Sequence, residues 1–398
     1  MDKESRSLEA SKVFTPTAPI DERSLFAGRH TQIRQIVDVV NQKGQHAVLF
    51  GERGVGKTSL ANILKDILIS SYNNIISPRI NCYADDTFDS VIEKAFGEIT
   101  LMSQRRKIGF SDKTDLNKFN ARDLIVGKID PESIRKALVL LSDIFKPIII
   151  FDEFDRLKPN VQNVFADLIK ALSDHAVGAT IIIVGVADSI DQLISAHQSV
   201  ERALMQIRMP RMSEDEVQEI FTKGYKHLGL SANDDAMLTA TRLAQGLPHY
   251  AHLIGLHSSR IAIEKDVNTI DLGTIRESIS LALGGAQQSI QSIWHKATMS
   301  PRKDNLFATV LLSCALAKTD ELGYFAAQDV RGPLNIITNK KYEIPNYSQH
   351  LKEFTEEKRG PVLKKIGTKR RYRFRFINPL MQPFVIMRGY NEGKVEFK

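Results

Sequence analysis

One eight-residue segment with three glycines constrains this chain more than any other feature. GERGVGKT, at positions 51–58, follows the apolar run HAVLF and precedes TSLANILKDILIS, which has the apolar spacing of a helix. A glycine-rich turn between a strand and a helix lets backbone N–H groups surround phosphate oxygens at a helix N-terminus, where the helix dipole also favours anions. The segment therefore predicts a loop that binds the phosphates of a nucleotide.

The residue types in this loop indicate separate roles. Lys57 is expected to neutralise the β and γ phosphates of a triphosphate, and the hydroxyl of Thr58 is expected to bind Mg²⁺. The predicted nucleotide contacts in the loop are Gly51, Glu52, Arg53, Gly54, Val55, Gly56, Lys57, Thr58 and Ser59. For Glu52, a surface charge is the alternative interpretation.

A second acidic element follows at 148–155, where IIIFDEFD places carboxylates after four apolar residues. This pattern is typical of a buried parallel strand that ends beside a phosphate site. Asp152 is predicted to hold Mg²⁺ through water, and Glu153 to orient the attacking water. Two adjacent carboxylates favour hydrolysis over transfer to a small alcohol. Asp155 is expected to be a surface charge.

The alternation of strands and helices predicts the fold class. The strand-like runs IISPRINCY and ATIIIV flank a helix that begins at Asp130 and Pro131, and GVADS brings Asp188 to the same sheet edge. Such alternation indicates an α/β fold with a parallel sheet. Residues 101–128, with seven basic and three acidic residues, predict an exposed insertion. It could contact nucleic acid or a partner, or be a solvated loop.

Helical patterns dominate the rest of the chain up to about residue 290. S-E-D-E at 213–216 is a capping box that opens the helix EVQEIFTKGYKHL. Further helices are expected from about Asp234, after Pro248 and from about Asp271. These patterns predict a helical region after the α/β part.

Positive charge is concentrated near the C-terminus. The segment from Lys352 to Arg388 contains eleven Lys and Arg but only three Glu. This excess of positive charge is larger than the net charge of +7 of the whole chain. Three helical patterns and then the strands VLKKI and YRFRF follow the outline of a winged helix, in which the helix around 348–358 would enter a DNA groove. A basic hairpin suits backbone phosphates, although protein docking is an alternative. The predicted DNA contacts are Lys364, Lys365, Lys369, Arg370, Arg371 and Arg373.

No targeting or membrane segment is expected. The run FATVLLSCALA at 307–317 is about half the ~20 residues that a membrane helix needs, and predicts a buried helix. The N-terminus lacks the apolar core of a signal peptide. Cys82 and Cys314 are expected to be buried apolar residues rather than a disulfide. A cytoplasmic protein is therefore predicted.

Four segments in order carry a resemblance to a known family. FAGR at 26–29, GERGVGKT, IIIFDEFD and GLPHY at 246–250 resemble an AAA+ ATPase of the origin-recognition and replication-initiator branch, or of the signal-transducing STAND branch. The resemblance implies a P-loop NTPase (AAA+) parallel sheet with a helical lid, followed by a winged-helix domain that binds double-stranded DNA, and it implies ATP and Mg²⁺ as cofactors. The expected parts are a flexible N-terminus at 1–20, a nucleotide-binding domain at 21–212, a lid at 213–295 and a winged-helix domain at 296–398.

Further site residues come from this resemblance by position. Asp188 falls where the family has a sensor asparagine, and a carboxylate there repels a γ phosphate unless it is protonated or bound to metal. His249 falls where many relatives carry a sensor arginine, and an imidazole is charged only part of the time near neutrality. Arg202, or else Arg208, is implied as an arginine that acts on a neighbouring subunit. The remaining implied nucleotide contacts are Phe26, Gly28, Arg29 and Pro248.

Two functions fit these expectations. The first is an ATPase that hydrolyses ATP and couples nucleotide state to DNA binding or assembly, as an ATP-dependent homo-oligomer or with a partner protein. The second is a STAND-like switch whose winged helix docks a protein effector, for example in phage defence. A small-molecule kinase is disfavoured, because residues 213–398 offer no obvious acceptor site.

Overall fold

The first part of the chain is built on a parallel sheet. The computed structural model describes residues 2–19, 24–69, 74–106, 114–186, 200–301, 305–320, 322–368 and 371–397. Six strands pair in parallel in the order β2-β6-β7-β1-β8, and β3 also pairs with β6. The strands are β1 (His46–Gly51), β2 (Ile75–Ile76), β3 (Arg79–Asn81), β6 (Lys146–Asp152), β7 (Thr180–Val186) and β8 (Leu204–Arg208). The predicted parallel α/β fold is confirmed.

Helices cover both faces of this sheet, which explains its continuous apolar strands. Along β1, Ala47 and Leu49 join one buried cluster, and Val48 and Phe50 join another on the opposite face. Side chains of α2 and α3 belong to the first cluster, and those of α4, α5 and α6 to the second. These helices are α2 (His30–Asn41), α3 (Lys57–Ile69), α4 (Phe88–Gly97), α5 (Pro131–Ser142) and α6 (Pro159–Asp174). We call this α/β part the base domain.

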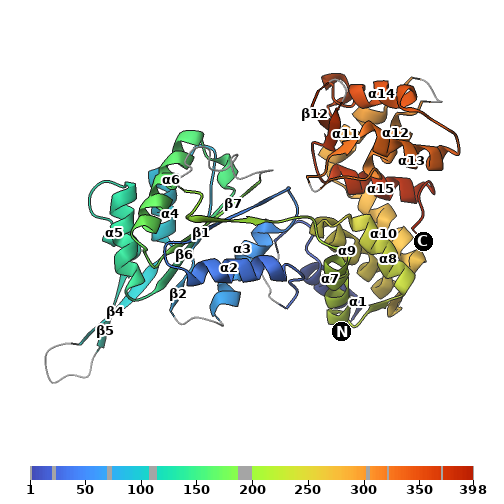
Figure 1. Ribbon diagram of the computed structural model, residues 1–398. Coiled ribbons are helices and arrows are strands. Elements are labelled where there is room, and N and C mark those ends of the chain that lie inside the picture. The colour runs from blue at the N-terminus through green and yellow to red at the C-terminus, as the bar shows by residue number, and fades with distance from the viewer. Residues whose placement is uncertain are drawn as a thin grey trace.

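The insertion expected at 101–128 is a β-hairpin rather than an irregular loop. β4 (Thr100–Arg106) and β5 (Thr114–Asn120) pair in antiparallel register from Thr100 with Asn120 to Arg106 with Thr114. Figure 1 shows the hairpin projecting away from the sheet. Cross-strand backbone hydrogen bonds form this element, which is why the weak periodicity of its sequence did not indicate strands. A 3₁₀ turn, η1 (Ala121–Leu124), follows it.

A bundle of helices forms the lid. Its elements are α7 (Glu214–His227), β9 (Ser231–Ala232), α8 (Asp234–Ala244), α9 (Pro248–Glu264), β10 (Thr269–Ile270) and α10 (Leu272–Gly284). The predicted capping box is present: the Glu216 amide donates to Ser213 Oγ over 3.2 Å, and the Ser213 amide donates to Glu216 Oε2 over 3.0 Å. The predicted helix starts at Asp234 and Pro248 are confirmed, and the one near Asp271 lies one residue further on.

The N-terminus, expected to be flexible, is ordered on the lid. Residues Lys3–Val13 form helix α1, which packs against α9 (Figure 1). The next residue, Phe14, is 1% exposed, and its ring fills the space above two glycines. A Cβ atom added at Gly224 on α7 or at Gly255 on α9 would lie 2.2 Å or 2.4 Å from this ring. Burial of one aromatic ring therefore anchors a segment whose own helix is largely polar.

The remaining helices and strands form a C-terminal unit. Its elements are α11 (Gln288–Thr298), α12 (Phe307–Ala315), β11 (Phe325–Ala326), α13 (Ala327–Thr338), α14 (Ile344–Glu353), η4 (Glu357–Arg359), β12 (Leu363–Ile366), β13 (Arg373–Phe376) and α15 (Met381–Asn391). The three strands form an antiparallel sheet in the order β11-β13-β12. Helices α12, α13 and α14 together with such a sheet are consistent with a winged helix.

Three boundaries differ from the expectations for this unit. The expected division between residues 295 and 296 falls inside α11, which continues to Thr298. The helix expected around 348–358 begins earlier, at Ile344, because Pro345 occupies its first turn, and it ends at Glu353. The Arg359 guanidinium, which pairs with Glu353 and lies 3.6 Å from the ring centroid of Phe307, closes the following turn.

α15 joins the C-terminal unit to the lid. It packs against α8 and α10 of the lid and against α11 and α12 of its own unit. Its sequence is buried on nearly all sides, including Met381, Phe384, Val385 and Ile386, as expected for a helix enclosed by other helices. Both cysteines, Cys82 and Cys314, are buried and unpaired, as predicted. No helix in the described ranges has the length and apolar character to cross a membrane.

Candidate nucleotide-binding site

The phosphate loop depends on glycine at two points. At Gly51 a Cβ atom would lie 2.3 Å from the carbonyl oxygen of Met209, so the last residue of β1 must lack a side chain. Gly56 has φ +94°, a conformation that L residues rarely adopt. This turn leads directly into α3, which begins at Lys57. The loop thus has the strand, turn and helix that anion binding requires.

Lys57 lies inside the loop. Its Nζ donates to the carbonyl oxygens of Gly51 over 3.0 Å and Glu52 over 2.7 Å. Burial lowers the pKa of Lys57 to about 8, although Asp155, Asp152 and Glu52 oppose this shift. A desolvated ammonium hydrogen-bonded to two carbonyl oxygens gains strongly from a phosphate, because charge-assisted hydrogen bonds are the stronger ones.

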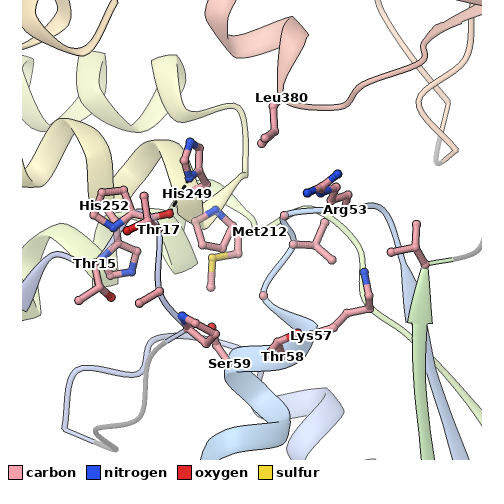
Figure 2. A pocket seen from close by; sticks show the side chains of 18 of the residues that line it. Thr15, Thr17, Arg53, Lys57, Thr58, Ser59, Met212, His249, His252 and Leu380 are labelled. Atoms are coloured by element: carbon pink, nitrogen blue, oxygen red, sulfur yellow. Dashed lines mark hydrogen bonds between the residues drawn. The ribbon is translucent and has the colours of Figure 1, made fainter. Parts of the chain in front are cut away.

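A cavity of about 620 Å³ adjoins the loop (Figure 2). The predicted residues that line it are Phe26, Arg29, Arg53, Gly54, Val55, Gly56, Lys57, Thr58, Ser59, Asp152, Glu153, Pro248 and His249. This volume is within the range of small-ligand sites. Residues 26, 152 and 249, far apart in sequence, therefore meet at one site.

Asp152 ends β6 at the same sheet edge as the loop. Its Oδ1 accepts from the amide of Glu153 over 2.8 Å, and its Oδ2 accepts from Arg79 Nη1 on β3 over 3.0 Å. The sequence did not indicate Arg79, because only the pairing of β3 with β6 brings it to Asp152. Asp155 is exposed, as expected, and it also lines the cavity, where its Oδ1 accepts from the amide of Val186 over 2.8 Å. The carboxylates Asp152 and Asp155 are therefore fixed by protein donors.

Glu153 has a constrained backbone and an exposed side chain. Its φ is +54°, in the left-handed region, which is uncommon for residues other than glycine. Its Oε2 pairs with Arg156 Nη1 over 2.7 Å. The ion pair is largely solvent-exposed and thus weak, so a ligand in the cavity could compete with Arg156 for the carboxylate.

The oxygen donors at this edge suit Mg²⁺. Thr58 and Asp152 line the same cavity and provide a hydroxyl and a carboxylate, the hard ligands that Mg²⁺ prefers together with phosphates and waters. Within the described residues, no group of three or more His, Cys, Asp or Glu could form an all-protein metal site. These residues fit a metal ion that arrives with a nucleotide.

The FAGR segment connects the loop to the lid. The Gly28 amide donates to Glu219 Oε2 over 2.8 Å, and the Arg29 amide donates to Glu216 Oε1 over 2.7 Å. Arg29 is 2% exposed, and its Nη2 donates to the Val55 carbonyl over 2.7 Å. Its Nε and Nη1 have no hydrogen-bond partner among the residues that the structure describes, and burial lowers its pKa. Arg29 is thus a buried cation with unused donors beside the loop.

The N-terminal segment forms a wall of the cavity that the sequence did not predict. Residues 15–19 line it, and His249 Nδ1 donates to the Pro16 carbonyl over 2.7 Å (Figure 2). Burial lowers the pKa of His249, against the effect of this hydrogen bond. His249 is therefore a neutral donor to the N-terminal segment at pH 7.

Several predicted site residues lie elsewhere. Gly28, Gly51 and Glu52 are not among the residues that line the cavity. The carboxylate of Glu52 accepts from Arg211 Nε over 3.0 Å, so it is not a free surface charge, and its nucleotide contact stays a prediction. Asp188 lies outside the described residues.

The two candidate arginines lie at opposite ends of β8, Arg202 just before the strand and Arg208 as its last residue. Arg202 is exposed just before β8, beyond the end that pairs with His46, so it is far from the phosphate loop along the sheet. Arg208 pairs with Phe50 at the loop end and lines a separate cleft. Neither of them lines the nucleotide cavity.

The predicted DNA contacts are placed in part. Lys364 and Lys365 are exposed on β12, and Lys365 Nζ lies 4.6 Å from the ring centroid of Tyr372. Arg371 is exposed, whereas Arg373 pairs with Asp320 over 2.9 Å. Lys369 and Arg370 lie outside the described residues.

Comparison with known proteins supports the interpretation of this cavity as a nucleotide-binding site. Residues 40–194 match the family model described as an AAA domain. This region holds both the phosphate loop and the strand that ends at Asp152. Residues 40–194 are therefore similar to an AAA domain, and the chain has the P-loop AAA+ fold.

Two solved structures are similar over nearly the whole chain. A Walker-type ATPase of Pyrococcus abyssi is 17% identical, with 94% of this chain and 99% of that one covered and a TM-score of 0.55. The ORC2 protein of Aeropyrum pernix, solved as ADPNP and ADP complexes, is 13% identical, with 96% and 98% covered and a TM-score of 0.51. At these identities the likeness shows the fold. None of the curated proteins compared with the chain matches its sequence.

Proposed function

We propose that this protein binds and hydrolyses Mg·ATP and couples its nucleotide state to binding of double-stranded DNA by the C-terminal unit. The observation that carries the proposal is the single cavity that holds Lys57, Thr58, Asp152 and Glu153. A buried ammonium faces the phosphates, two oxygen donors face the metal, and a carboxylate is available to orient water. The division into a base domain, a lid and a C-terminal unit is part of the proposal.

Hydrolysis is tested by Glu153→Gln. The amide keeps the size of the side chain but cannot accept a proton, so Mg·ATP binding should persist while turnover falls by about 100-fold or more. Turnover is measured by phosphate release, and binding by the fluorescence of a labelled nucleotide. Glu132→Gln is a matched control, because Glu132 also pairs with an arginine three residues on, but lies on α5 outside the cavity. Unchanged turnover in Glu153→Gln would contradict the proposal.

DNA binding rests on the exposed cations of the β12–β13 hairpin. Replacement of Lys364, Lys365 and Arg371 together by alanine should weaken binding of a duplex and reduce the slope of log K against log salt by about 2–3, since each phosphate contact contributes about 0.9. Fluorescence anisotropy at several salt concentrations measures both quantities. The control replaces three exposed lysines of the base domain, Lys128, Lys136 and Lys170. Equal losses in both triple variants would indicate a general charge effect and would argue against this interface.

A nucleotide-dependent switch with little turnover is the second candidate. It is favoured by the ion pair that holds Glu153 on Arg156 and by the neutral His249 at the position of a sensor arginine. In that case the C-terminal unit would dock a protein effector. Absence of phosphate release by the unmodified protein, with or without duplex DNA, would favour this candidate.

A further inference from the structure

Four parts of the chain meet at the side chain of Arg211. This residue belongs to the connector between β8 and α7, and its side chain is 24% exposed. Its Nε donates to Glu52 Oε2 in the phosphate loop over 3.0 Å. Its Nη1 donates to Gln382 Oε1 on α15 over 2.8 Å and approaches the Gln245 carbonyl at the end of α8 at 3.5 Å. One guanidinium thus joins the base domain, the lid and the C-terminal unit.

Gln382 is fixed in the orientation that this contact needs. It is 8% exposed, and its Nε2 donates to the Ala315 carbonyl of α12 over 2.8 Å. Because the amide nitrogen is used within the C-terminal unit, the amide oxygen is presented to Arg211. A buried amide oxygen without a donor would destabilise this arrangement. Displacement of Arg211 would therefore remove a hydrogen bond from the first turn of α15.

Glu52 connects Arg211 to the residue that binds phosphate. Its side chain accepts from Arg211, and its backbone carbonyl accepts from Lys57 Nζ over 2.7 Å. A triphosphate would compete with this carbonyl for the ammonium and would win, since an anionic acceptor makes the stronger hydrogen bond. Occupancy of the site by phosphate therefore changes the interactions of residue 52.

Two further contacts place the C-terminal unit against the loop. A Cβ atom added at Gly323 would lie 3.1 Å from Glu52 Oε1, and one at Gly54 would lie 3.3 Å from a methyl group of Leu380. Figure 2 shows Leu380 descending from the C-terminal unit toward the cavity. A cleft of about 670 Å³ lies beside these contacts, between Gln35 and Arg208 of the base domain and Thr319 of the C-terminal unit. The C-terminal unit therefore contacts the phosphate loop directly, through Gly323 and Leu380.

We propose that Arg211 is a positioning residue that transmits phosphate occupancy from Lys57 and Glu52 to Gln382 and so sets the position of the C-terminal unit. The inference rests on the proposed nucleotide binding and adds to it the path of regulation. It requires that Arg211 and Gln382 act in one network rather than separately.

Hydrogen exchange at the start of α15 tests this path without DNA or hydrolysis. The full chain is compared with and without saturating Mg·ATPγS, and amide exchange in peptides over residues 377–386 is measured by mass spectrometry. In the unmodified protein the nucleotide should change this exchange by about fivefold or more, the usual scale of coupling between sites. In Arg211→Met the change should fall below about twofold while nucleotide still binds. If nucleotide changed the exchange in Arg211→Met as much as in the unmodified protein, the proposal would be overturned.

Further variants separate the path from general loosening. Gln382→Met should lose the response as Arg211→Met does, and the double variant should lose no more than either single one, as expected within one network. Arg388→Met, which removes a guanidinium from the same helix, where it stacks on Trp294 at 3.7 Å, should keep the response. Loss of the response in Arg388→Met as well would contradict the path. Failure to bind nucleotide at all would contradict the proposed function, whereas binding without any response would contradict only the coupling.

Discussion

Lys57 makes nucleotide affinity depend on pH. Burial lowers its pKa to about 8 in the structure, and an adjacent polyphosphate would raise this pKa again. Above pH 8 binding must therefore include proton uptake, so affinity for Mg·ATPγS should fall as the pH rises through 8, by up to about tenfold per pH unit. Titration with a fluorescent nucleotide between pH 7 and 9.5 measures the slope.

Lys57→Arg supplies the control for this pH dependence. Arginine stays charged throughout the range, so the variant should bind more weakly overall but with a flat profile between pH 7 and 9.5. A slope that survives in Lys57→Arg would assign the pH dependence to another group.

Sequence patterns found the parts of the site whose geometry is local. The loop from Gly51 to Thr58 and the carboxylate of Asp152 could be predicted, because a strand, a turn and a helix N-terminus are encoded by neighbouring residues. Arg79 and Arg211 could not, because each reaches the site only through pairing or packing with residues far away in sequence. Asp155 is exposed as predicted, but its place at the cavity was not predicted, because nothing in its neighbours shows that the cavity extends to it.

At the scale of elements, patterns of apolar residues predicted most of the sheet and lid, but not the ordering of α1. Its sequence gives little amphipathic signal, and its position depends on what Phe14 contacts. Larger side chains at positions 224 of α7 and 255 of α9 would occupy the space of this ring. Glycine at both positions leaves room for it. The β4–β5 hairpin was missed for a related reason, since its pairing is made by the backbone.

The space above Gly224 and Gly255, which we call the Phe14 slot, predicts how substitutions there change the free energy of unfolding. Phe14→Ala should lower the free energy of unfolding by about 3–5 kcal/mol, because it removes a fully buried ring. Gly224→Ala should also destabilise, since its methyl would lie 2.2 Å from the ring. In the Phe14→Ala background the same methyl has room, so the double variant should be less destabilised than the sum of the single effects. Urea denaturation measures all three; additive effects would contradict the slot.

At the scale of the whole molecule, α15 packs the lid and the C-terminal unit against each other. It is buried among helices of both, and the Tyr250 hydroxyl of α9 donates to the Leu380 carbonyl over 2.5 Å. The base domain, in contrast, meets the C-terminal unit at the phosphate loop beside an open cleft. A nucleotide at the loop would lie beside this contact, which is where the coupling proposed above would act.

Phe384→Ala tests whether these parts unfold as one body. The variant removes a ring that is 1% exposed on α15 and should lower the unfolding free energy by about 3–5 kcal/mol. Trp294, the single tryptophan, lies on α11 against Arg388 of α15 and reports on the C-terminal unit. Hydrogen exchange in α8 and α10 reports on the lid. In Phe384→Ala, the stability reported by Trp294 and the stability reported by exchange in the lid should fall together. Phe165 lies in the aromatic cluster on the far face of the sheet. Phe165→Ala should therefore destabilise the base domain more than it changes the unfolding transition reported by Trp294 fluorescence. A lid unaffected by Phe384→Ala would show that the lid and the C-terminal unit are separate bodies, since α15 could then loosen without reaching α8 or α10.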